Sequence, residues 1–243
     1  MKYFVSIYSP VNKVYIIERT HLNIQRFISF TILYLCFIQS STAQTINVKV
    51  FDAKNNPLPD VVVYLEPPQG MVVEQSDTII EIAQVDKSFS PYLGVIQKGT
   101  KVKFHNKDDI SHQIYSPVGE NKFAFKISAG EELVKSNFIN VGAIAMGCNI
   151  HDWMSGHLLV LDTPYFAKTN KQGEVSIDIA ESGKYNLVVW HPQMREKNQR
   201  MGKTINSIDY VDKNSLVKIS LLKSLDELPS QKNDDDFDFL SDY

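Results

Sequence analysis

The chain has 243 residues, 43% of them hydrophobic and 11% aromatic, which is enough to bury one or two cores and excludes a wholly disordered protein. Its formal net charge at pH 7 is only −3, and no basic stretch is interleaved with aromatic residues. Nucleic acid is therefore not expected as a partner.

The first 43 residues have the pattern of a secretory signal peptide. A twelve-residue apolar run from Phe27 to Ile38 follows Arg26 and is followed by small and polar residues ending at Ala43. The run is shorter than the ~20 residues that a membrane-spanning helix needs, although a retained membrane anchor is the alternative. We expect cleavage after Ala43, no membrane span in the mature chain, and a periplasmic or secreted location.

Cleavage at that point changes two counts. Four basic residues and one acid are lost from 25 and 28, which leaves 21 against 27 and a net charge of −6. Of the two cysteines only Cys148 remains, so the mature chain has no partner for an internal disulfide. A lone thiol in an oxidising compartment is a liability unless something occupies it, and metal ligation would do so.

From Thr45 onward the chain reads as an all-β protein, because short alternating apolar runs are separated by Gly, Pro, Asn and Asp turns. Ile46, Val48 and Val50 alternate with polar residues, and a turn at 55–60 leads to a second strand at 61–65 that we expect to be buried on both faces. The pattern divides the mature chain into four parts: a first hairpin of a flanking sandwich at 45–70, a Greek-key domain at 79–162, the remainder of the flanking sandwich at 163–225, and an acidic disordered tail at 226–243.

Three metal donors lie within seven residues, in the run Cys148-x2-His151-x2-Met154. One Cys, two His and a weak axial Met make up the ligand set of a mononuclear electron-transfer copper site. The missing imidazole is best supplied by His112, thirty-six residues upstream of Cys148. Taken alone, each residue has an ordinary reading as a small core residue, a packing residue or a turn residue; together they favour copper.

The two segments resemble the cupredoxins. Phe104-x-Asn106-x-Asp108-x3-His112 is followed later by Cys148-x2-His151-x2-Met154-x-Gly156, and the short ligand loop is most similar to that of amicyanin. The departures are Ser111 and Gln113 on either side of His112, where the family commonly has Pro and Asn, and Asp152-Trp153 within the loop.

The resemblance implies a cupredoxin sandwich at 79–162 that binds one copper ion through His112, Cys148, His151 and Met154. It also implies that Asn106 hydrogen-bonds to the backbone of the loop that carries three of these donors. Trp153 is expected either to shield the copper or to lie at the exposed edge near His151, which would be the ligand closest to solvent.

The flanks resemble a different family. Val48-x-Val50-x-Asp52 and Gly173-x-Val175-x-Ile177 are similar to the two halves of a carboxypeptidase regulatory-like, Ig-like β-sandwich. This implies that the cupredoxin module is inserted in a second sandwich or followed by one. Secreted proteins that combine such features are often labelled plastocyanin-like or methylamine utilization proteins.

The function that these patterns favour is that of an exported type 1 (blue) copper protein, which carries one electron and docks transiently with a cytochrome or dehydrogenase. The alternative is a binding or adhesion module with a structural or sequestered copper ion. An enzyme is not expected, because no catalytic triad, phosphate loop or paired carboxylates are visible and four donors leave no open position for a substrate. Zinc could also occupy the Cys and His donors, and a second site from His157 and His191 is a less favoured hypothesis.

Overall fold

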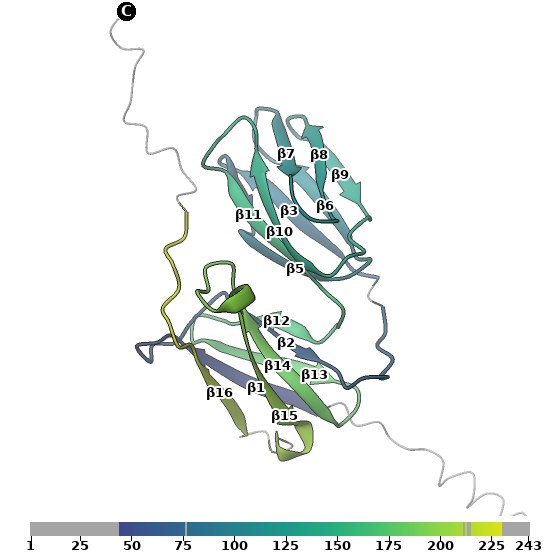
Figure 1. The fold of residues 1–243 in the computed structure, drawn as a ribbon. Coiled ribbons are helices and arrows are strands. Elements are labelled where there is room, and N and C mark those ends of the chain that lie inside the picture. The colour runs from purple at the N-terminus through teal and green to yellow at the C-terminus, as the bar shows by residue number, and fades with distance from the viewer. Residues whose placement is uncertain (1–43, 76, 211, 213–214, 230–243) are drawn as a thin grey trace, which may run out of the picture. The chain divides into compact units, whose positions relative to one another are not determined.

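The computed structural model describes residues 44–75, 77–210, 212 and 215–229, and this part of the chain is an all-β protein. Its strands form four sheets that make up two β-sandwiches (Figure 1). The helices found here are two 3-10 turns, η1 (Lys197–Gln199) and η2 (Ser207–Tyr210), and no helix among the described residues has the length and apolarity to cross a membrane. The expected signal peptide and residues 230–243 of the expected tail lie outside the described residues.

One sandwich, the flanking sandwich, is built from both ends of the described chain. Its two sheets have the orders β13-β1-β16 and β12-β2-β14-β15, and only the β1–β16 pair is parallel. The strands are β1 (Gln44–Phe51), β2 (Val62–Glu66), β12 (Phe166–Lys168), β13 (Glu174–Ile179), β14 (Lys184–Trp190), β15 (Arg200–Asn206) and β16 (Leu216–Ser220). β1 and β2 pair only with strands that follow residue 165. The residues between β2 and β12 therefore form an insertion in this sandwich.

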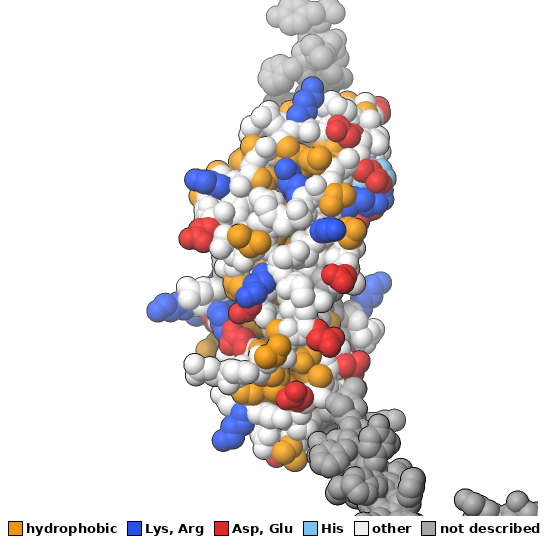
Figure 2. Space-filling view, turned by 90° about the vertical axis from the view of Figure 1, so that its right-hand side faces the viewer, with side chains coloured by type: hydrophobic (Ala, Val, Ile, Leu, Met, Phe, Trp, Pro, Cys, Tyr) orange, Lys and Arg blue, Asp and Glu red, His pale blue; other side chains and the backbone are white. Residues whose placement is uncertain are grey.

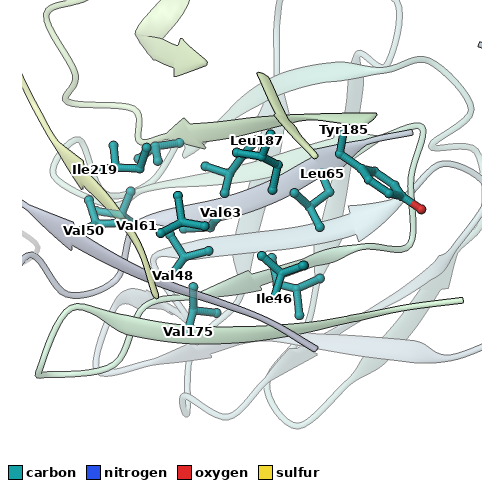
Figure 3. Packing of buried hydrophobic residues seen from close by; sticks show 14 of the residues in the cluster. Ile46, Val48, Val50, Val61, Val63, Leu65, Val175, Tyr185, Leu187 and Ile219 are labelled. Atoms are coloured by element: carbon teal, nitrogen blue, oxygen red, sulfur yellow. The ribbon is translucent and has the colours of Figure 1, made fainter. Parts of the chain in front are cut away.

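The core of the flanking sandwich follows from the alternation in its strands. In β1 the side chains of Ile46, Val48 and Val50 are buried and the residues between them are partly exposed. Figure 3 shows these side chains gathered with Val63 and Leu65 of β2 between the ribbons of the two sheets. Each such side chain stabilises the fold by about 1.5–3 kcal/mol when it is fully buried. Whether this sandwich belongs to the family that its sequence resembles stays a prediction.

The hairpin predicted at 45–70 is wrong in its pairing. β1 and β2 do not pair with each other but lie in different sheets on opposite sides of the same core. The turn between them closes locally on the end of β1, where the Leu58 N–H donates to the Val50 carbonyl at 3.0 Å, and the chain then crosses to the other sheet. The reason is burial, because both strands direct alternate apolar side chains into one core and two facing sheets accommodate this.

The second sandwich, the inserted sandwich, has sheets of order β5-β11-β10-β7-β8 and β4-β3-β6-β9. Two neighbouring pairs are parallel, β3 with β6 and β5 with β11, so the chain crosses between the sheets. The strands are β3 (Ile79–Val85), β4 (Ser88–Ser90), β5 (Leu93–Gln97), β6 (Lys101–Asn106), β7 (His112–Ser116), β8 (Phe123–Ile127), β9 (Glu132–Lys135), β10 (Gly142–Cys148) and β11 (Ser155–Leu161).

In the core of the inserted sandwich, Val102 and Phe104 of β6 are fully buried and alternate with more exposed residues. The rings of Phe123 and Phe125 pack against Phe104 with centroids 5.9 and 5.0 Å away. On the face seen in Figure 2, hydrophobic side chains lie in small groups among Lys, Arg, Asp and Glu of both signs.

Three central strands, β2, β11 and β14, are buried on both faces. In β11, Leu158 and Val160 belong to the core of the inserted sandwich, whereas Leu159 and Leu161 belong to a third cluster. That cluster, which we call the seam, draws residues from β2, β5, β11 and β14: Val62, Tyr64, Leu93, Leu159, Leu161, Val188 and Trp190. Burial of both faces of β2 confirms the prediction for residues 61–65, and near-continuous apolar runs are typical of such strands.

The predicted limits of the acidic tail need a correction at residue 226. The side chain of Asp226 pairs with Arg195, and its N–H donates to the Gln193 carbonyl at 2.9 Å. The ordered chain therefore extends past the predicted start of the tail, because a partner for the first carboxylate lies in the loop after β14.

Candidate metal centre

Two adjacent strands bring distant donors together. His112 is the first residue of β7 and Cys148 is the last residue of β10, and these strands pair antiparallel with Cys148 opposite Ile114. Beyond the ladder, the Asn149 N–H donates to the Gln113 carbonyl at 3.0 Å. The start of one strand is thereby held beside the end of the other.

The loop at residues 149–154 brings the remaining candidates back to the same place. The Met154 N–H donates to the His151 carbonyl at 3.0 Å, which closes a turn immediately before β11 begins at Ser155. Cys148 and Met154, 3% and 1% exposed, both belong to the core cluster of the inserted sandwich. The two sulfur-bearing side chains are therefore shielded from bulk water.

The donor atoms of three residues converge. Nδ1 of His112 lies 3.6 Å from Sγ of Cys148, and Nδ1 of His151 lies 3.8 Å from the same sulfur. All three donor atoms lie within 4.8 Å of one another. A metal bonded at about 2.0 Å to nitrogen and about 2.3 Å to sulfur separates two such donors by about 3.5–3.7 Å for angles between tetrahedral and trigonal. The spacing therefore fits one ion held by two imidazoles and a thiolate.

The environment of His151 favours its metal-binding form. Burial lowers the pKa of His151, and electrostatic interactions with His112 and Lys87 act in the same direction, against an opposing effect of Asp108. A neutral imidazole offers the lone pair that a metal needs. His151 is 7% exposed and His112 is not exposed at all, so His151 is the more accessible of the two rings.

Met154 enters the site by its position in the loop and its burial. Its side chain also lines a groove of about 360 Å³ together with Cys148, Tyr115 and Asp152. Its assignment as the axial ligand stays a prediction.

The predicted hydrogen bond from Asn106 to the backbone of the loop that carries Cys148, His151 and Met154 (the metal loop) is wrong. Its side-chain amide is buried, and Nδ2 donates to the carbonyls of Ile110 at 2.7 Å, Ser128 at 3.0 Å and Ile127 at 3.3 Å. These groups belong to the loop before His112 and to the end of β8. Asn106 therefore orders the approach to His112, and the metal loop is tied instead by the bond from Asn149 to Gln113.

Trp153 packs against one candidate ligand. The centroids of its ring and of the His151 ring are 5.2 Å apart, at an interplanar angle of 55°, and the indole is partly buried against the core. Trp153 was expected either to shield the copper or to lie at the exposed edge near His151. Its contact with the His151 ring favours the second position.

Asp108 has a contact that sequence reasoning did not assign. Its Oδ2 lies 2.8 Å from Nε2 of His112, on the side of the ring opposite the converging donors. The sequence feature that could have indicated this contact is the position of a carboxylate, Asp108, four residues before the candidate ligand His112. Metal-binding His residues usually donate their second ring N–H to such a group.

One further set of potential donors occurs among the described residues, Glu81, His105 and Glu132. Here the carboxylates already have cationic partners, since Lys103 pairs with both and Lys107 with Glu81. The hydrogen bonds from Lys103 and Lys107 lower the pKa of Glu81 to about 2. We therefore interpret this set as a surface ion-pair network.

No protein-family model matches the chain, and no curated protein is found to be similar to it. Among solved structures, a purple cupredoxin from Nitrosopumilus maritimus is 23% identical, with a TM-score of 0.31 and coverage of 34% of this chain and 99% of its own. A copper-containing nitrite reductase from Thermus scotoductus is 22% identical, with a TM-score of 0.32, and the match spans 46% of this chain and 28% of the reductase. A mutant of amicyanin in its reduced state is 16% identical, with a TM-score of 0.32 and coverage of 40% and 99%. At these values the interpretation of the site depends on the arrangement of its own donors.

Proposed function

We propose that the chain is a type 1 copper protein of the cupredoxin kind, which binds one copper ion and carries one electron. The observation that supports this most directly is the approach of two imidazole Nδ1 atoms to one buried thiol sulfur, at 3.6 and 3.8 Å. Copper at such a site supplies a one-electron couple whose potential the ligands and their surroundings set.

In this proposal the residues of the chain keep the site rigid. The paired ends of β7 and β10 hold His112 and Cys148, and the turn at 151–154 fixes His151 and Met154 before β11 begins. Rigid donors limit rearrangement when the electron arrives or leaves. His151, the more accessible imidazole, is the proposed point of exchange with a transient redox partner, a cytochrome or dehydrogenase.

We also propose that the protein is exported and acts as a carrier rather than as an enzyme. Export follows from the signal pattern of the first 43 residues. A site with four protein donors would offer no open position to a substrate. The alternative, a binding module with a structural or sequestered copper ion, differs in that its metal need not change oxidation state.

The test is the visible and paramagnetic resonance spectrum of the mature chain after addition of copper. A strong charge-transfer band from the Cys148 thiolate to Cu(II) is expected, with loss of the band in Cys148→Ser and His112→Gln. His105→Gln is the matched control, because His105 lies on β6 within the separate ion-pair network and should leave the band intact. A colourless copper-loaded wild type contradicts the proposal, and a coloured site that a mediator cannot reduce reversibly supports the alternative.

A further inference from the structure

The carboxylate of Asp108 accepts hydrogen bonds from three groups at once. Oδ1 lies 2.7 Å from the N–H nitrogen of Asp86, and Oδ2 lies 3.0 Å from that of Lys87 and 2.8 Å from Nε2 of His112. The side chain of Asp108 is only 10% exposed, so these donors take the place of most of its water. Hydrogen bonds to an ionised acceptor are stronger than those between neutral groups.

This arrangement fixes which nitrogen of His112 carries the proton. An ionised carboxylate can only accept, so the contact at Nε2 requires a proton on that nitrogen. In the neutral ring the lone pair then belongs to Nδ1, the atom that lies 3.6 Å from Sγ of Cys148. The tautomer inferred from the contacts is therefore the one that a metal beside Cys148 requires.

The carboxylate is itself held in place from two directions. Asp86 and Lys87 form the tight turn between β3 and β4, with φ of 52° and 57°, and both of their N–H groups point at Asp108. On its own loop, the Asp108 N–H donates to Oδ1 of Asn106 at 3.0 Å. His112 is thereby connected through Asp108 to a turn in the opposite sheet, and the carboxylate beside its Nε2 is itself fixed by hydrogen bonds from that turn.

We infer that Asp108 is a positioning residue for the metal site: it selects the Nε2–H tautomer of His112, orients the ring, and places a negative charge behind this ligand. The charge increases the electron-donating power of the imidazole and stabilises Cu(II) relative to Cu(I). The tautomer is a property of the metal-free chain, and the effect on copper rests on the function proposed above.

The first test uses the metal-free mature chain and the long-range coupling of ring protons to the nitrogens of His112 in nuclear magnetic resonance. Wild type should show a proton on Nε2 only. Asp108→Asn should populate the other tautomer measurably, because an amide cannot accept from all three donors. Asp109→Asn is the matched control, since it removes the same charge from an exposed neighbour. A proton on Nδ1 in wild type overturns the inference without any need for a variant.

The second test compares copper binding and reduction. Loss of a partner that orients a metal-bound His typically costs about 10- to 100-fold in affinity, so we expect this loss for Cu(II) in Asp108→Asn and not in Asp109→Asn. A roughly tenfold greater loss for Cu(II) than for Cu(I) raises the reduction potential by about 59 mV. A blue wild type whose affinity and potential do not change in Asp108→Asn overturns the role of Asp108 alone. A wild type that binds no copper contradicts the proposed function, while the resonance experiment still decides the tautomer.

Discussion

His191 makes stability depend on pH in a way that can be calculated. It follows β14 and is 4% exposed, and burial, with a smaller effect of the positive charge of His157, lowers its pKa from 6.5 to about 4. Between these two values the unfolded chain binds a proton that the folded chain does not. Stability is therefore complete above pH 6.5 and is lost as the pH falls toward 4.

The expected size of this effect follows from the two pKa values. Between pH 7.5 and pH 5, a residue with a pKa of 6.5 unfolded and about 4 folded removes about 2 kcal/mol from the free energy of unfolding. His151 and His157, whose pKa values are also lowered, act in the same direction. A variant of His191 is therefore needed to isolate its share.

The assay is urea denaturation of the metal-free chain at the two pH values, for wild type and His191→Asn. Asn is chosen because its carbonyl can replace Nδ1 as the acceptor of the Gln193 N–H, which lies 3.3 Å away. Wild type should lose about 2 kcal/mol more than the variant, with the same dependence on urea concentration in both. Equal losses in the two proteins would refute the reasoning.

Three other predictions concern the backbone and the metal. Gly173 and Gly130 share a φ of +70°, but a Cβ at Gly173 would meet backbone atoms at 2.5 and 2.9 Å and one at Gly130 would meet nothing within 4 Å. In the same urea assay, Gly130→Ala should lower the free energy of unfolding by about 1 kcal/mol and Gly173→Ala should lower it distinctly more. Equal decreases in the two variants would contradict this. Copper at 1,000 times its dissociation constant should add about 4 kcal/mol to the stability of wild type and not to that of Cys148→Ser, as calorimetry with and without a chelator can measure. Copper should quench the fluorescence of Trp153, and Trp153→Phe, which keeps only Trp190, should lose most of this response.

The alternation of apolar residues predicted much of the fold, because alternation reports which side chains face a core. The burial of Ile46, Val48 and Val50 follows from it, whereas the two buried faces of residues 61–65 follow from an unbroken apolar run. Alternation does not report which strand is the neighbour, and for this reason the pairing of β1 with β2 was predicted wrongly. β10 was not predicted as a separate strand, because Gly and Ala provide four of its seven residues and have a low preference for strands.

The candidate metal donors could be named from the sequence because three of them lie in one short run. The hydrogen bonds around them were not, since they join segments that only the folded chain brings together. The amide of Asn106 reaches the end of β8, and the carboxylate of Asp108 reaches the turn at Asp86 and Lys87. A list of residue types at given spacings carries no information about such contacts.

The presence of a flanking sandwich around the inserted one has a physical explanation in β11. This strand begins directly after Met154, and its alternate side chains enter two different clusters, Leu158 and Val160 in the inserted core and Leu159 and Leu161 in the seam. Without β2 and β14, which supply Val62 and Val188 to the seam, the outer face of β11 would expose contiguous apolar surface. The flanking sandwich covers this surface and holds β11 on both faces. The strand that leaves the loop at 149–154 is therefore packed on both of its faces.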